Sequence, residues 1–399
     1  MSKIINSIFH VVFLLIAFSS LNFIELIPKR YLPILELLPF FLYILSLILG
    51  YRFNRSLVIY SSSIFISCYL YFWFLPHWST TQHFLALNSL AIIAAVNIAL
   101  ISYYSERGVF TYIGIIRLSL IALFLLIPYW LVNDLSKNYL QMINQVIFPA
   151  LEVKLVFFKQ SALLAILLSM IIISSSFMAR SNPFRSAILV SLILCLYALT
   201  LPKNHLLSQA VITSFAILLP LISLISESYR MAFIDELTNL PGRRALNETL
   251  AKLSNQYVIA MLDVDHFKKF NDTYGHDAGD DVLQLLGGRL KNVTGGGQPF
   301  RYGGEEFTIV FPGSGLDDVE EHLEQLRESV ANRKFSLRKQ ERRKKGKSKK
   351  SATGRQVNVT ISIGYAEPSS RNKTPTQVIK EADKALYKAK KKGRNCISH

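Results

Sequence analysis

Repeated apolar runs occupy residues 1–229 and constrain the fold of this chain more than any other feature. Each run approaches the roughly 20 residues that an α-helix needs to cross a lipid bilayer. Only 13 Lys and Arg and 6 Asp and Glu interrupt these runs. The pattern predicts an all-α transmembrane bundle of about eight spans, near residues 5–27, 32–50, 57–76, 84–104, 109–131, 161–179, 186–201 and 207–226.

Residues 132–160 are the ambiguous part of this region, because they are apolar yet contain Pro149, Glu152 and Lys154. We interpret them as an interfacial helix, with seven or nine spans as the alternatives to eight. The first apolar run lacks a small-x-small cleavage site, and further spans follow it. We therefore expect a retained anchor and not a signal peptide.

The three cysteines of the chain are Cys68, Cys195 and Cys396. Their spacing matches neither a disulfide framework nor a metal site. Two of them fall in apolar runs and the third in the C-terminal tail. We interpret all three as small apolar residues.

The composition changes after residue 229, where the chain carries 31 Lys and Arg and 21 Asp and Glu. A Pro241–Gly242 turn signal ends the helical pattern of the last span and marks a domain boundary. Beyond it, strands and helices alternate, which predicts an α/β sheet domain. We expect a helix from near Arg243, strands at 257–263, 299–302, 306–311 and 357–364, and helices at 278–293, 316–333 and 375–391.

Two acidic clusters stand at ends of the predicted strands. Asp263 and Asp265 follow the apolar strand in "LDVDHFKKFNDTYGHDAGDD", and Glu305 and Glu306 follow two glycines in "RYGGEEF". Crowded carboxylates cost stability unless a cation holds them. If the two strands are neighbours, hard oxygen ligands from both clusters would bind Mg²⁺ or Mn²⁺ and support phosphoryl transfer. The alternative is a solvated acidic turn.

Residues 230–399 resemble the GGDEF domain of diguanylate cyclases, the bacterial enzymes that join two GTP molecules into cyclic di-GMP and release two pyrophosphates. The resemblance covers about two-fifths of the chain. It depends on five blocks in order, "DELTNLPGRR", "LDVDHFKKFNDTYGHDAGDD", "RYGGEEF", "VTISIGYA" and "ADKALYKAKKKGRN". It implies a central, mainly antiparallel sheet of the nucleotidyl-cyclase or palm type.

The resemblance also implies roles for particular residues of this chain. Metal ligands would be Asp263, Glu306 and the backbone of Val264, and Glu305 would be a ligand or the base that activates the 3′-hydroxyl. Asp265 is expected to orient the loop. Guanine would be selected by Asn271 and Asp280, with His276 framing the pocket. Phosphates would meet backbone N–H groups of Phe267 and Lys268 and the side chains of Lys390 and Arg394, which we expect on one face of a helix because they are four residues apart.

One GTP per active site requires two domains facing each other, so the resemblance implies a homodimer with two-fold symmetry. We expect residues 230–399 in the cytoplasm, carried by a multi-pass segment of a bacterial inner membrane. Residues 1–229 would then be a sensory region that regulates the catalytic domain. The alternatives are a catalytically silent GTP-binding regulatory domain, or a transporter or receptor whose soluble part is secondary.

Two stretches depart from the family pattern. The Arg-x-x-Asp product-inhibition site of many members is replaced by Thr294-Gly295-Gly296-Gly297, so we expect no product binding there. Residues 333–355 hold twelve Lys or Arg and one Glu. This segment is interpreted either as a solvated loop or as a contact for anionic lipid. Its single aromatic residue, Phe335, makes nucleic-acid binding the weakest interpretation.

Overall fold

The structure is a computed structural model that describes residues 2–74, 80–103, 108–134, 160–180, 183–201, 205–336, 356–369 and 374–399. The chain divides into two compact units, Met1–Ser228 and Tyr229–His399. Most of the ambiguous segment 132–160 and of the basic segment 333–355 lies outside the described residues.

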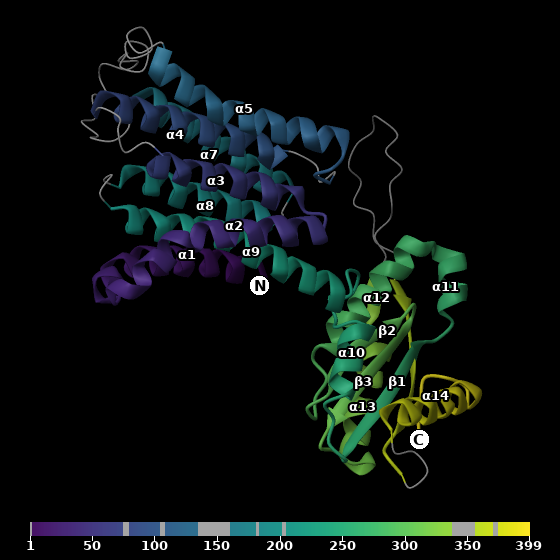
Figure 1. The fold of residues 1–399 in the computed structure, drawn as a ribbon. Coiled ribbons are helices and arrows are strands. Elements are labelled where there is room, and N and C mark those ends of the chain that lie inside the picture. Colours follow the sequence, from purple (N-terminus) through teal and green to yellow (C-terminus); the bar gives the residue numbers. More distant parts are fainter. Residues whose placement is uncertain are drawn as a thin grey trace, which may run out of the picture. The chain divides into compact units, whose positions relative to one another are not determined.

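The first unit is helical, and eight α-helices among its described residues coincide with the eight predicted spans (Figure 1). They are α1 (Ser2–Ser20), α2 (Leu32–Arg52), α3 (Ser56–Phe74), α4 (Thr80–Tyr103), α5 (Tyr112–Asp134), α7 (Gln160–Arg180), α8 (Pro183–Thr200) and α9 (Leu206–Phe233). Short 3₁₀ turns, η1 (Leu21–Leu26) and η2 (Lys29–Tyr31), join α1 to α2. Four of the described helical stretches are long and apolar enough to cross a membrane, at 8–26, 29–52, 82–103 and 206–233. The count of eight membrane spans therefore stays a prediction.

Contacts between helix ends fix the direction of the helices inside this unit. Arg55, immediately before α3, forms an ion pair of 3.1 Å with Glu227 near the end of α9, so α3 and α9 are antiparallel. The Gln209 side chain of α9 donates to the Leu201 carbonyl at the end of α8, as expected for antiparallel neighbours joined by a short turn. It follows that α3 and α8 run in the same direction.

The second unit has a five-stranded sheet in the order β2-β3-β1-β6-β7. Its strands are β1 (Tyr257–Val264), β2 (Gln298–Gly303), β3 (Glu306–Pro312), β6 (Ile361–Ala366) and β7 (Ile397–Ser398). All pairings are antiparallel except β6 with β7, which is parallel. The sheet is therefore mixed and predominantly antiparallel.

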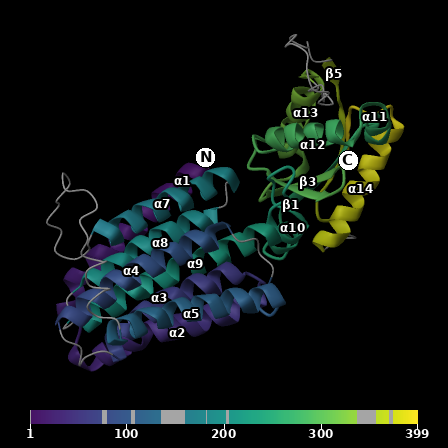
Figure 2. The same cartoon turned by 90° about the horizontal axis from the view of Figure 1, so that it is seen from above.

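Strand β1 is central and buried along its whole length, which explains its continuous apolar sequence. Alternate residues face opposite sides of the sheet. Val258, Ala260 and Leu262 pack in the core that contains α12 (His276–Leu290) and α13 (Leu316–Ala331). Ile259 and Met261 face α10 (Arg243–Leu250) and α14 (Pro375–Lys391), so helices cover both sides (Figure 2). By the same alternation Asp263 belongs to the α14 face.

Two predicted elements of this unit were wrong in their bounds. The strand expected at 357–364 is divided, because β5 (Gln356–Asn358) pairs with β4 (Lys334–Ser336) in a separate two-stranded sheet before β6 begins. The helix expected at 278–293 begins at His276 and ends at Leu290. A further helix precedes it, α11 (Phe267–Tyr274), and Gly275 separates the two at φ 88°.

Gly364 is the place where α14 packs most closely on the sheet. A Cβ atom at this position would lie 1.9 Å from the Leu386 nitrogen and 2.3 Å from the Ala382 oxygen, both backbone atoms of α14. We expect Gly364→Ala to lower the free energy of unfolding of this unit by about 3 kcal/mol or more, because backbone has to move. Gly288→Ala is the matched control, since nothing lies within 4 Å of that Cβ. Thermal unfolding of both variants checks the prediction, and equal melting temperatures would contradict it.

Candidate active site

The two acidic clusters meet at the turn that joins β2 to β3. Asp263 near the end of β1 is the register partner of Glu306 at the start of β3, and Glu305 precedes it in the turn. Gly303 ends β2 and Gly304 begins this turn, and a Cβ at either position would meet nothing within 4 Å. The turn therefore leaves its backbone accessible to a bound molecule.

Burial raises the pKa of Asp263, Glu305 and Glu306 above their ordinary values. The charge of Asp263 raises the pKa of both glutamates further, and Asp383 of α14 adds to the effect on Glu306. Lys390 of α14 opposes these shifts through an ion pair of 2.9 Å between its Nζ and Asp263 Oδ1. The site thus concentrates negative charge, which the ion pair with Lys390 partly neutralises.

Lys390 and Arg394 do not share a helical face, which corrects the expectation from their spacing. Helix α14 ends at Lys391, and Arg394 lies in the following turn with φ 69°. Its N–H nevertheless bonds the Ala389 carbonyl at 3.2 Å, which keeps this turn against the helix end. The positive charge of Arg394 reaches Asp263 and, like that of Lys390, opposes the rise that burial causes in the pKa of this carboxyl. Both cations therefore act on the acidic cluster, from different local structures.

Phe267 and Lys268 are the first two residues of α11, which His266 precedes in the left-handed conformation at φ 57°. The first N–H groups of a helix have no acceptor within the helix, and its N-terminus favours anions. This helix start directly follows the Asp263–Asp265 segment. The placement suits the phosphate role expected for these two backbone groups.

Asn271 on α11 lies directly against Gly279 on α12. The Oδ1 atom of Asn271 is buried and has no hydrogen-bond partner among the residues that the structure describes. A Cβ on Gly279 would lie 1.9 Å from it, so a larger residue at this position would displace the Asn271 side chain. Asp280 follows Gly279 and is exposed, as is His276 at the start of α12. A buried acceptor without a partner is a group that a ligand N–H would satisfy.

From the guanine-binding role that the resemblance implies for Asn271, we expect Gly279→Ala to raise KM for GTP by about tenfold or more, because the displaced Asn271 oxygen would lose a hydrogen bond to guanine worth about 1.5 kcal/mol. Cyclic di-GMP synthesis over a range of GTP concentrations measures it. Gly288→Ala lies on the same helix with open space around it and serves as the control. An unchanged KM in Gly279→Ala would exclude Asn271 from guanine binding.

Asp265 is tied into the structure and does not face the cluster as a free carboxylate. It accepts hydrogen bonds from Thr360 Oγ1 at 2.7 Å, Ser362 Oγ at 2.6 Å and the Asn395 N–H at 3.0 Å. These bonds hold the end of β1, the start of β6 and the turn after α14 together. The arrangement agrees with the orienting role expected for Asp265.

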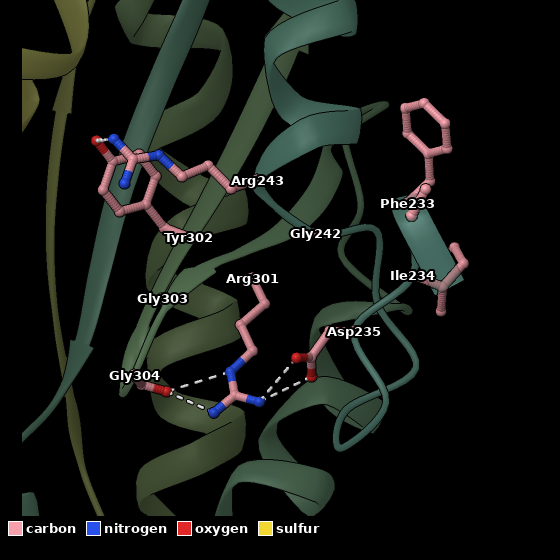
Figure 3. Close-up of a pocket in the computed structure, with 10 residues that line it drawn as sticks. Phe233, Ile234, Asp235, Gly242, Arg243, Arg301, Tyr302, Gly303 and Gly304 are labelled. Carbon is pink, nitrogen blue, oxygen red and sulfur yellow. Dashed lines mark hydrogen bonds and ion pairs between the residues drawn. The ribbon is translucent and has the colours of Figure 1, made fainter. Parts of the chain in front are cut away.

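Sequence reasoning missed a contact that holds the turn between β2 and β3, at Gly304 and Glu305, which is called the signature turn below and which Figure 3 shows. Arg301 Nη1 binds both carboxylate oxygens of Asp235 at 2.8 and 2.9 Å. Its Nε and Nη2 donate to the Gly304 carbonyl at 3.2 and 2.7 Å. Asp235 also accepts from the N–H and hydroxyl of Thr238, in the turn that follows α9. The occurrence of these residues in the blocks "DELTNLPGRR" and "RYGGEEF" was the only signal in the sequence.

This contact, called the Arg301 clamp below, lies beside a cavity of about 390 Å³. On its other side the Arg243 guanidinium stacks over the Tyr302 ring, 4.7 Å from the centroid, and approaches the Tyr302 hydroxyl at 3.4 Å. Burial opposes ionisation of Asp235, but the bonds from Thr238 and Arg301 prevail and lower its pKa. The clamp therefore joins the Asp235 turn to the signature turn through a charged pair.

The acidic cluster fits a divalent cation by the chemistry of its donors. Asp263, Glu305 and Glu306 offer hard carboxylate oxygens, and their mutual repulsion is what a cation relieves. Among the described residues, no three His, Cys, Asp or Glu side chains are already gathered as a metal site. Lys390 holds Asp263 Oδ1 in this arrangement. Metal binding would therefore require these side chains to turn towards one another.

Raised carboxyl pKa values make the cation-free fold less stable as pH increases. Between about pH 4 and the raised pKa values, the folded state holds more protons than the unfolded state, so the free energy of unfolding falls with rising pH. We expect Glu306→Gln to melt about 2 °C or more above the wild type at neutral pH without divalent cation. The difference should vanish near pH 4 and shrink when Mg²⁺ is added. Melting curves at several pH values test this sign, and a less stable variant at neutral pH would contradict it.

Residues 232–396 match the family described as "Diguanylate cyclase, GGDEF domain". The chain is 38% identical over 182 residues to the response regulator PleD of Caulobacter vibrioides, covering 43% of this chain and 37% of PleD. It is 33% identical over 179 residues to the diguanylate cyclase DgcP of Pseudomonas aeruginosa, covering 43% and 24%. The chain spans less than half the length of these curated relatives.

A solved structure is also similar, that of the coiled coil and GGDEF domain of DgcB from Caulobacter crescentus in complex with c-di-GMP. It is 30% identical, covers 45% of this chain and 91% of that chain, and superposes with a TM-score of 0.39.

Proposed function

Since residues 232–396 form a GGDEF domain, we propose that this protein is a membrane-anchored diguanylate cyclase that condenses two GTP into cyclic di-GMP and two pyrophosphates. The observation that carries the proposal is the register of β1 and β3, in which Asp263 lies opposite Glu306 beside the open glycine turn. Named diguanylate cyclases among the relatives support the same activity.

The residues of this chain divide the work between binding and proton transfer. Asn271 and Asp280 accept hydrogen bonds from guanine, which adenine cannot supply in the same pattern. The first N–H groups of α11, Lys390 and Arg394 hold the triphosphate. Glu305 or Glu306 takes the proton of the 3′-hydroxyl as its oxygen attacks the α-phosphorus of the opposing GTP and pyrophosphate leaves.

Asp263, Glu306 and the Val264 carbonyl would hold a divalent cation, Mg²⁺ or Mn²⁺, with Glu305 as a further ligand or as the base. A bound cation of this kind neutralises phosphate oxygens and lowers the pKa of a hydroxyl beside it. The raised pKa values of the two glutamates mean that a proton acceptor here is stronger than an exposed glutamate.

Regulation follows in our proposal from a homodimer of such chains in a bacterial inner membrane. Residues 1–229 sense a stimulus and residues 230–399 act in the cytoplasm, with His276 at the edge of the guanine pocket. Helix α9 is continuous from Leu206 to Phe233 and passes from one unit into the other. Small changes in the approach of the two catalytic sites change the rate strongly. We also propose that residues 333–355 contact anionic lipid and that the protein binds no specific nucleic acid.

The test is incubation of the purified full-length chain in lipid with GTP and Mg²⁺. We expect cyclic di-GMP and pyrophosphate in a ratio of one to two, and no cyclic product from ATP. Binding of GTP without product would favour the silent regulatory domain. A solute flux that persists in a variant without acidic cluster residues would favour a transporter.

A further inference from the structure

A cavity of about 290 Å³ lies between the C-terminal part of α12 and the residues that follow α13. Its lining contains two arginines, Arg289 on α12 and Arg333, two residues beyond the end of α13. None of the described residues that line it is acidic, and none belongs to the candidate active site. This cavity is called the α12 pocket below.

Different elements bring the two arginines to the α12 pocket. Arg289 lies in the last turn of α12 and is half-buried, whereas Arg333 is exposed. The Arg333 N–H bonds the Val330 carbonyl of α13 at 3.2 Å, and β4 begins at the next residue. The backbone that carries Arg333 is therefore fixed on one side by a helix end and on the other by a strand.

The charge of the two arginines is not balanced within the described part of the chain. Neither guanidinium forms an ion pair with any residue that the structure describes. Two like charges that line one small cavity repel one another unless an anion lies between them. The α12 pocket is therefore a candidate site for an anion.

The chemistry of the donors indicates which anion fits. Guanidinium groups bind phosphate oxygens in pairs of parallel hydrogen bonds. The amides of Gln284 and Asn292 line the same pocket and add further N–H donors. A phosphate monoester carries a charge of about −1.5 to −2 near pH 7 and so balances both arginines, whereas a carboxylate or a phosphate diester balances only one.

The size of the pocket and one apolar side chain limit the phosphate compound further. A volume of about 290 Å³ is at the lower end of ligand pockets, roughly 300–1,000 Å³, and favours a small headgroup over a nucleotide. Leu285 lines the same pocket and is 40% exposed, so it offers an apolar contact beside the arginines. Eleven further Lys and Arg follow Arg333 up to residue 355 and attract an anionic membrane surface.

We propose that the α12 pocket binds the headgroup of an anionic phospholipid through a phosphate monoester, with Arg289 and Arg333 on the phosphate oxygens and Leu285 against the glycerol. Occupation of the pocket would hold the second unit at the membrane surface. The lipid as the source of the phosphate depends on the membrane anchoring proposed above. The catalytic activity proposed above plays no part in it.

The experiment uses the full-length chain in lipid nanodiscs and measures how fast each arginine reacts with phenylglyoxal, by mass spectrometry of peptides. The nanodiscs contain phosphatidylcholine alone, or with phosphatidic acid, or with phosphatidylglycerol added to the same surface charge. We expect phosphatidic acid to slow the modification of Arg289 and Arg333 about tenfold or more, because charge-assisted bonds cover both groups. Phosphatidylglycerol, a diester, should slow it by no more than about threefold. Arg244, exposed on α10, is the internal reference and should react equally in all samples.

Each other outcome overturns a stated part of the proposal. Equal protection by both anionic lipids would mean a general surface contact and no monoester pocket. Full protection by inorganic phosphate in phosphatidylcholine nanodiscs would mean a soluble ligand and no lipid. A chain that does not remain with the nanodiscs contradicts the anchoring and, with it, the lipid source. No GTP is present, so an inactive enzyme does not affect the result.

Arg289→Gln tests whether the two arginines form one site. In this variant Arg333 should lose most of its protection by phosphatidic acid. Lys291→Gln is the matched control, because Lys291 is exposed at the end of the same helix and does not line the α12 pocket. Unchanged protection of Arg333 in Arg289→Gln would overturn the shared site. Because the main measurement uses the unsubstituted chain, misfolding of a variant cannot account for a negative result.

Discussion

Glu306→Gln is expected to lower the rate of cyclic di-GMP synthesis by about 10³-fold, because the substitution removes a charged ligand worth several kcal/mol in the transition state. The amide has nearly the same shape, and the carboxyl pKa is already raised by burial and by Asp263. The fold should therefore tolerate the change. The measurement is product formation under saturating GTP and Mg²⁺, with binding of a GTP analogue followed separately.

Asp383→Asn is the matched control for this loss. Asp383 is an exposed carboxylate on α14 whose charge also reaches Glu306, but no role in catalysis is expected for it. Removal of such a surface charge should change the rate by no more than about threefold. If both substitutions reduce the rate equally, the effect is one of local charge. If neither does, Glu306 is not part of the reaction.

The same assay distinguishes the two glutamates of the signature. Glu305→Gln removes a proton acceptor or a ligand from the turn, whereas Glu306 is fixed in β3 by its pairing with Asp263. A general base contributes its pKa to the acid limb of the pH profile of kcat. Loss of the base removes this limb. The glutamate whose substitution flattens the acid limb is then the base.

The secondary structure of the second unit was predictable where one physical signal dominated. The apolar run of β1 reads as a strand because both its faces are buried. Helix α11 was missed because its eight residues are mostly polar, and Phe267 is the only buried one. The division of β5 from β6 depends on pairing with β4, a contact between residues far apart in the sequence. Local patterns carry no information about such a partner.

The candidate site also could be predicted only in part from local sequence patterns. The acidic clusters were visible as short motifs, and the register of β1 with β3 places them opposite one another. The contact of Asn271 with Gly279 and the position of Arg394 beyond the end of α14 depend on backbone geometry at the helix ends. The Arg301 clamp joins residues separated by 65 others. Only the folded chain reveals these contacts.

The second prediction of a large effect on the reaction rate concerns the Arg301 clamp. Arg301→Lys is expected to lower kcat by about 10²-fold, because displacement of a catalytic group by about 1 Å lowers the rate by about that factor. A lysine ammonium cannot reproduce the planar fork that binds the Asp235 carboxylate and the Gly304 carbonyl together. The residues expected to bind guanine and phosphate lie on α11, on α12, on α14 and in the turn after α14, so KM for GTP should change little. Steady-state kinetics separates the two parameters.

Asp235→Asn tests whether the clamp acts as a unit. This substitution keeps one acceptor oxygen for Arg301 but removes the charge that the ion pair requires. We expect a smaller loss of kcat than in Arg301→Lys, and a double variant no worse than Arg301→Lys alone, because coupled residues are not additive. Arg244→Lys, a neighbouring exposed arginine on α10, should leave kcat unchanged. Additive losses in the double variant would mean that Arg301 positions the signature turn without help from Asp235. The turn after α9 would then not affect the position of the catalytic residues.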